Sequence, residues 1–179
     1  MMESIELQGG MMKRIFRYLL MLLLLALAPP ASALCICTCT VSATGISFGA
    51  YNPFASSDVD AAGSVTFSCS GALSVGSVPY TIYLSPGHSG AVLARVMDNT
   101  GDTSFHLNYN MYTSDPDSGV IWGDGSGGTF ISGTLSVPLL GSDSDTYTIY
   151  GRIPGGTQPT AHVGNYLDTI TVTVNFSLL

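Results

Sequence analysis

The chain has 179 residues, which suits one domain with an appendage, and its formal net charge is −7. Charged residues make up 9% of the sequence, against about 25% in an average soluble protein. With 46% hydrophobic residues, the composition excludes a disordered chain and a long charged coiled coil. The acidic balance also argues against a nucleic-acid-binding protein, because such proteins need a basic face.

The N-terminal residues 13–33 contain the three parts of a secretory signal peptide in order. Basic residues begin the segment, an apolar run of ten residues follows, and an Ala-Ser-Ala cleavage site ends at Ala33. Ten apolar residues are too few for a transmembrane helix, which takes about 20. We therefore predict that residues 1–33 are an N-terminal extension and signal peptide, and that residues 34–179 form an exported domain without a transmembrane segment.

The predicted mature chain has an unusual charge composition. It contains two arginines and ten aspartates, but no lysine and no glutamate. A surface with so few charges has to be built from Ser, Thr, Asn, Gly and Asp. This composition is typical of an exported β-protein rather than of a cytosolic enzyme.

All four cysteines follow the predicted cleavage site, and an even number in an exported chain indicates disulfides. Cys35, Cys37 and Cys39 are spaced by two, so on a strand they share one face. Neighbours at this spacing lie at the far limit of disulfide reach. The easiest long-range bridge therefore joins one of the three to Cys69. Thiolates on one face also suit Cu(I) or Zn, but no further ligand nearby completes a tetrahedral site, and we favour disulfides.

Beyond residue 40, apolar and polar residues alternate with the period of a half-buried β-strand. The predicted strands are 64–69, 80–85, 105–113, 146–149 and 169–176. Loops rich in Gly, Pro, Asn and Asp separate them, and no segment after the signal shows a capped helical pattern. Short strands joined by such loops predict an all-β sandwich or barrel.

The three histidines do not form a catalytic or metal-binding motif. His88, His106 and His162 lie in a turn, on the polar side of a strand and in a loop, and none has a partner at a metal-ligand spacing. Residues 123–128 are similar to the sequence around a trypsin-like serine nucleophile, but an extra glycine separates the aspartate from the serine. We interpret the histidines as solvated and this segment as a hairpin loop.

The paired aspartates do not indicate a calcium site either. Asp115/Asp117 and Asp143/Asp145 lack the EF-hand spacing and its terminal glutamate, so we interpret them as turn caps. The sequence thus predicts no catalytic residue, no cofactor and no metal ion, and the protein is not expected to be an enzyme.

Several segments together resemble the spore coat protein U domain, through their order and spacing rather than through any single piece. These segments are 39–53, 63–71, 109–112, 122–125, 150–154 with Gln158, and 164–176. They extend over nearly the whole predicted mature chain.

The resemblance implies the subunits of archaic chaperone–usher pili, which are Ig-like β-sandwiches that lack one strand. In such systems a periplasmic chaperone lends a strand, an outer-membrane usher exports the subunit, and the N-terminal extension of another subunit completes the fold by β-strand addition. The resemblance therefore implies a non-enzymatic structural or adhesive subunit. It would be exported through the periplasm to the cell surface, in a pilus that serves adhesion and biofilm formation, or in a coat.

The resemblance also implies particular site residues. The family's disulfide corresponds to Cys39–Cys69, which closes a loop of about 30 residues and stabilises by roughly 3–4 kcal/mol in the chain-entropy model. A missing strand leaves apolar side chains and unpaired backbone groups beside a terminal strand, and another chain can complete it. The residues expected to line or flank this partner-strand groove are Ile170, Val172, Val174 and Phe176.

The sequence departs from this pattern before its first family cysteine. After cleavage at Ala33, only residues 34–38 precede Cys39, and five residues span about 17 Å with two apolar side chains. Such a chain can receive a strand but can hardly donate one, which favours a tip or other minor subunit. The alternative is a stand-alone secreted carbohydrate-binding β-sandwich, which should fold as a monomer without a chaperone.

Overall fold

Ten β-strands and two short 3₁₀ helices make up the regular structure of the residues that the computed structural model describes, 36–71, 76–117 and 119–178. In chain order they are β1 (Cys37–Thr44), β2 (Val59–Gly71), β3 (Gly76–Leu84), η1 (Gly87–Ser89), η2 (Val92–Ala94), β4 (Val96–Asn99), β5 (His106–Asn108), β6 (Asn110–Tyr112), β7 (Ile131–Val137), β8 (Ser142–Ile153), β9 (Tyr166–Leu167) and β10 (Val172–Phe176). The predicted signal peptide and Cys35 lie outside the described residues. No helix among the described residues is long and apolar enough to cross a membrane.

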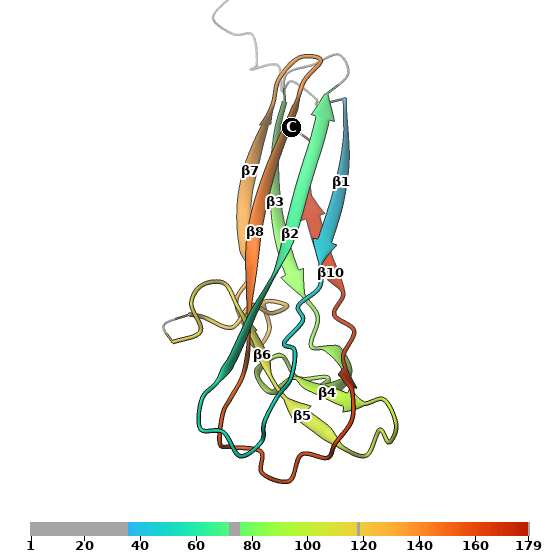
Figure 1. Cartoon of the computed structure of the whole chain (residues 1–179). Coiled ribbons are helices and arrows are strands. Elements are labelled where there is room, and N and C mark those ends of the chain that lie inside the picture. The colour runs from blue at the N-terminus through green and yellow to red at the C-terminus, as the bar shows by residue number, and fades with distance from the viewer. Residues whose placement is uncertain (1–35, 72–75, 118, 179) are drawn as a thin grey trace, which may run out of the picture. The chain divides into compact units, whose positions relative to one another are not determined.

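The strands form three antiparallel sheets. One has the order β1-β2-β8-β6, a second has the order β10-β3-β7, and a small third sheet has the order β5-β4-β9. Figure 1 shows the first two sheets packed face to face, with β1 and β10 on one side and β7 and β8 on the other, while β4 and β5 lie toward the opposite end from the connection between β7 and β8. This arrangement confirms the predicted all-β class and is consistent with an Ig-like sandwich.

Alternation along the long strands builds the core between the two facing sheets. Val65 and Phe67 on β2 point inward, as do Tyr80 and Ile82 on β3, and all four are buried. The rings of Phe67 and Tyr80 lie 4.8 Å apart between their centroids. The period-2 pattern predicted from the sequence therefore marks the inner faces correctly in these strands.

The outer face of the four-stranded sheet carries hydroxyl groups in register. Four successive rows across β1, β2 and β8 are Thr38/Ser70/Ser142, Thr40/Ser68/Ser144, Ser42/Thr66/Thr146 and Thr44/Ser64/Thr148. Some of these groups satisfy one another, as in the 2.8 Å contact between the hydroxyls of Thr66 and Thr146. Hydroxyl groups thus make this face polar, which explains how the surface can contain so few charged residues.

The predicted strands differ from the observed ones in their bounds, and one of them, 105–113, is in fact two strands. β5 pairs with β4, whereas β6 pairs with β8 in another sheet. The break lies at Tyr109, and the next residue, Asn110, turns its side chain inward although the alternation predicts an outward position. Its Oδ1 accepts hydrogen bonds from the buried Arg95 Nη1 (2.8 Å) and from the Met111 amide (2.9 Å).

Candidate functional site

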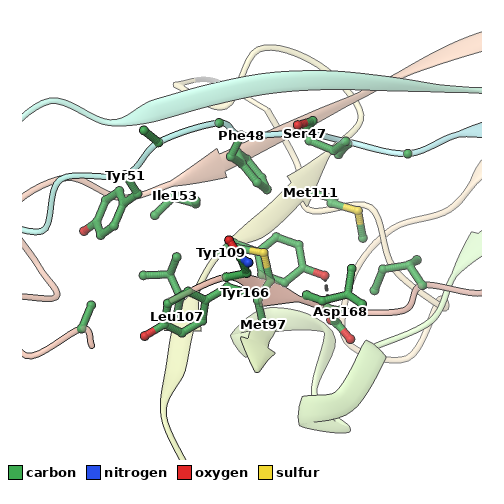
Figure 2. A pocket seen from close by; sticks show the side chains of 18 of the residues that line it. Ser47, Phe48, Tyr51, Met97, Leu107, Tyr109, Met111, Ile153, Tyr166 and Asp168 are labelled. Carbon is green, nitrogen blue, oxygen red and sulfur yellow. Dashed lines mark hydrogen bonds between the residues drawn. The ribbon is translucent and has the colours of Figure 1, made fainter. Parts of the chain in front are cut away.

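A cavity of about 940 Å³ lies between two segments that are distant in the sequence. Residues 43–53 form one wall and residues 161–172 form the other. The floor consists of apolar core side chains and one tyrosine: Leu84, Met97, Leu107, Tyr109, Met111, Ile149 and Ile153. Figure 2 shows Phe48 and Tyr51 on one side of this space and Tyr109, Tyr166 and Asp168 on the other.

The first wall continues beyond the end of β1 without a strand partner. None of the backbone–backbone hydrogen bonds among the described residues involves 46–51. The segment nevertheless alternates like a strand, because Ile46 and Phe48 are half-buried and their neighbours are exposed. Two glycines make room for them: a Cβ on Gly63 would lie 3.0 Å from Ile46 Cγ1, and one on Gly151 would lie 2.8 Å from Phe48 Cζ.

The second wall leads into β10. Ile170 and Val172 are half-buried and line the cavity. β10 pairs with β3 on one side and is the terminal strand of its sheet, and β1 is likewise terminal in the facing sheet. The cavity therefore lies where both sheets end in an edge with unpaired backbone groups.

A hydrogen-bond network holds the second wall against the floor. Tyr109 Oη donates to Asp168 Oδ2 (2.7 Å), while Asp168 Oδ1 accepts from the amides of His88 (3.0 Å) and Thr169 (2.7 Å). Burial, together with the bond to Asp168, raises the pKa of the Tyr109 hydroxyl well above its usual range. Gly87, at φ +69°, packs so closely that an added Cβ would lie 2.1 Å from Asp168 Oδ2.

A fully buried arginine supports the irregular backbone next to the floor. Arg95 Nη2 donates to the carbonyls of Leu84 (3.2 Å), Ser85 (2.8 Å) and Trp122 (2.9 Å), and Nη1 donates to Asn110 Oδ1 (2.8 Å). Burial lowers the pKa of its guanidinium. Arg95 thus ties the end of β3 to β6 and to the segment around Trp122, at the place where the chain passes from the large sheets to the small one.

The four residues predicted for a partner-strand groove occupy two different environments. Ile170 and Val172 line the cavity. Val174 is half-buried and packs against the core between the two facing sheets. Phe176 is 46% exposed and packs its ring against Phe67, with 5.5 Å between the ring centroids. The structure thus brings two of the four to the cavity and places two beside it.

The first wall was not identified from the sequence. Ile46 and Phe48 alternate with small and polar residues in the sequence, within the segment 39–53 that resembles the spore coat protein U domain. What the sequence does not show is that this segment lacks a strand partner. Alternation reveals which side chains face inward, but it does not reveal which backbone groups remain unpaired.

The disulfide lies at the far end of β1 from the cavity. Cys39 and Cys69 are directly opposite each other on β1 and β2, with a Cα–Cα distance of 4.1 Å, and their sulfurs are bonded, as the resemblance implies. Cys37 is disulfide-bonded as well. The Cys39–Cys69 bridge fixes β1 to its own sheet.

The histidines that the sequence offered as candidate ligands contact neighbouring side chains. His88 and His106 are exposed, as interpreted, but the sequence did not show that both contact Asp98, at 3.1 and 2.8 Å from Nδ1. The ring of His162 stacks on Phe105. Within the described ranges, no group of three or more His, Cys, Asp or Glu side chains is arranged to hold a metal ion.

The paired aspartates accept hydrogen bonds from backbone amides or from side chains. Asp115 Oδ1 accepts from the Asp117 amide, and Asp143 accepts from the amides of Ser136 and Ser144. Asp145 accepts from the Tyr80 hydroxyl at 2.5 Å. None of these contacts forms a calcium-binding loop.

Comparison with known proteins agrees with this architecture. The family model of the Spore Coat Protein U domain matches residues 26–173. The chain belongs to this family. Among the curated proteins, none matches it.

Three solved structures are similar to this spore coat U chain. One is the chaperone–tip adhesion subunit pre-assembly complex CsuC–CsuE from the archaic chaperone–usher Csu pili of Acinetobacter baumannii, with 24% identity, 79% of this chain and 40% of that chain covered, and a TM-score of 0.47. Another is a chaperone–tip adhesin complex of CFA/I fimbriae biogenesis, with 12% identity, coverage of 79% and 42%, and a TM-score of 0.44. A third is the minor tip subunit HdaB of the E. coli Hda pilus, with 14% identity, coverage of 79% and 84%, and a TM-score of 0.37. The chain spans less than half the length of the first two, and the family assignment rests on the family model alone.

Proposed function

We propose that this chain is a non-enzymatic structural or adhesive subunit of a chaperone–usher-type pilus or surface coat, and that its cavity receives a β-strand from a partner. The observation that carries the proposal is the cavity itself, which lies between residues 46–51 and the free edge of β10. The first wall and the outer edge of β10 offer unpaired backbone groups, and the floor between them is mostly apolar. An extended peptide satisfies both needs at once by β-augmentation.

The dimensions of the first wall define the occupant. Six residues of extended chain span about 20 Å, and alternate side chains of a strand point to one face. A partner strand of similar length would direct about three apolar side chains onto the floor. Its own backbone would pair with the edges on either side, so the sandwich would become complete.

The proposed partners follow from this mode of assembly. A periplasmic chaperone would fill the cavity first, an outer-membrane usher would export the subunit, and another subunit would then supply its strand. Such a chain reaches the cell surface through the periplasm, where it would take part in adhesion and biofilm formation. Membership of the Spore Coat Protein U domain family supports this assignment of partners.

Within an assembly, we assign this chain to the tip or to another minor position. β1 pairs along its whole length with β2, so a donated strand would have to come from residues that precede it. The predicted cleavage after Ala33 leaves only residues 34–38 before Cys39, which is about 17 Å of extended chain. The chain can therefore accept a strand, but it has little to give.

The proposal is tested by producing the mature chain in a bacterial periplasm with and without the chaperone of its assembly system. With the chaperone we expect a soluble 1:1 complex, and without it we expect degradation or aggregation. A soluble monomer that unfolds cooperatively without help would contradict the proposal. That outcome would favour a stand-alone carbohydrate-binding sandwich.

A further inference from the structure

The methionines have an unusual distribution in this protein. After residue 21 the sequence contains only two, Met97 and Met111. Both line the cavity floor, and both are nearly buried, at 8% and 3% exposure. Figure 2 shows both side chains beside the empty space.

Away from the cavity, the core between the two facing sheets contains side chains of other types than methionine. Its fully buried residues include Val65, Phe67, Val78, Ile82 and Val137. β-branched side chains have one strongly preferred rotamer and aromatic rings are rigid, so such a core fixes one packing arrangement. Methionine has three rotatable bonds and a polarisable sulfur, and it fills spaces of irregular shape.

The two methionines reach the floor from different sheets. Met97 lies on β4 opposite Leu107, and Met111 lies on β6 opposite Gly151. Each can therefore change rotamer without moving the other's strand. The walls beside them are stiffer, because Ile46, Ile170 and Val172 are β-branched.

We propose that Met97 and Met111 make the floor adaptable, so that the cavity accepts partner strands whose inward side chains differ in size. This inference rests on the proposed function, in which a chaperone strand gives way to a different strand from another subunit. Two successive occupants of one site need not share the same side chains, and a flexible floor lets both pack without a void.

The test uses the chaperone-bound protein and a set of synthetic peptides. Each peptide alternates Thr and Val over nine residues between terminal lysines, with one Val replaced by Ala, Leu or Phe at each inward position in turn. Apparent affinities come from competition with the bound chaperone. For the wild-type protein we expect the three replacements to bind within about tenfold of one another at every position.

The informative variant is the double substitution Met97→Ile and Met111→Ile, which keeps the floor apolar but stiffens it. We expect the spread among Ala, Leu and Phe peptides to widen to about 100-fold at one or two positions. The matched control is Leu135→Ile, which changes branching at a buried residue of β7 that does not line the cavity and should leave the spread near the wild-type value. Each single methionine variant is also measured, so that a folding defect in the double variant does not hide the effect.

Two outcomes would overturn the inference: an unchanged spread in the methionine variants, or a spread of about 100-fold already in the wild-type protein. Failure of every peptide to displace the chaperone from the wild-type protein would instead refute the proposed strand-accepting cavity, and this inference with it. The two failures are therefore distinguishable.

Discussion

The hydroxyl of Tyr109, on the cavity floor, is hydrogen-bonded to the carboxylate of Asp168 in the second wall at 2.7 Å. This contact connects the turn between β5 and β6 to the segment that leads into β10. It is made by a tyrosine that is 6% exposed, so water cannot easily replace the lost partner. This side-chain pair therefore helps to position the wall, together with the His88 amide, which also donates to Asp168, and the pairing of β9 with β4.

The first prediction concerns Tyr109→Phe. The substitution removes the donor and leaves Asp168 Oδ2 without its bond, which should lower the stability of the chaperone-bound subunit by about 1–3 kcal/mol. The denaturant midpoint of the complex measures this change. Tyr83→Phe is the control, because Tyr83 packs its ring on Phe130 and should change stability by no more than about 0.5 kcal/mol. Equal midpoints for the two variants would contradict the assigned role.

The second prediction concerns alkaline pH. Burial and hydrogen bonds to aspartates raise the pKa of both Tyr80 and Tyr109 above the usual tyrosine range. A group whose pKa is raised in the folded state adds stability below its unfolded pKa, about 10 for tyrosine, and this stability is lost as the pH rises further. We expect the denaturant midpoint to fall steeply above pH ~10. The Tyr80→Phe and Tyr109→Phe double variant should show a weaker dependence, and an unchanged slope would refute the assignment.

The third prediction separates the two faces of β10. Val172 lines the cavity, whereas its neighbour Thr173 is exposed on the other face. Val172→Asp would place an unpaired carboxylate under the partner strand, where desolvation is costly. We expect it to abolish chaperone capture and surface display, while Thr173→Asp keeps both. A chaperone pull-down and a surface immunoblot measure the outcome, and equal losses would show that the cavity does not receive a strand at this edge.

The fourth prediction concerns the glycine beneath the first wall. A Cβ on Gly151 would lie 2.8 Å from Phe48 Cζ and 2.9 Å from Ile46 Cδ1, which are the flexible ends of two side chains. Gly151→Ala should therefore keep the fold but push Phe48 toward the cavity, weakening partner binding by about tenfold. At Gly45 an added Cβ meets nothing within 4 Å, so Gly45→Ala should bind normally. Normal binding by both variants would mean that Phe48 does not border the occupied space.

Much of the fold could be predicted from the sequence because side-chain alternation reports burial directly. The inner faces of β2, β3 and β8 follow this pattern. The Cys39–Cys69 bridge could also be predicted, because the family resemblance implies it. Alternation reports nothing about hydrogen-bond partners. In residues 105–113 apolar and polar side chains alternate without a break at Tyr109, although the backbone passes there from one sheet to another. One strand was therefore predicted where two exist.

The candidate site was harder to predict for the same reason. Ile170 and Val172 were expected at the groove because they belong to a C-terminal segment whose apolar and polar residues alternate regularly. The opposite wall, 46–51, has a strand-like pattern but no strand beside it, and that absence is a property of the whole fold. Arg95 was not singled out either, because a lone arginine in a sequence gives no sign that five hydrogen bonds from its guanidinium hold irregular backbone together.

The pairing of β1 with β2 along its whole length, together with the short segment predicted before it, has a consequence for the number of copies in a proposed fibre. A subunit without a strand to donate ends the series of strand donations, so growth cannot continue past it. Each fibre then contains one such chain at its terminus, whatever the fibre's length. The number of copies of this protein on a cell would therefore equal the number of fibres. The number of copies of the strand-donating subunits would instead be proportional to the combined length of all fibres.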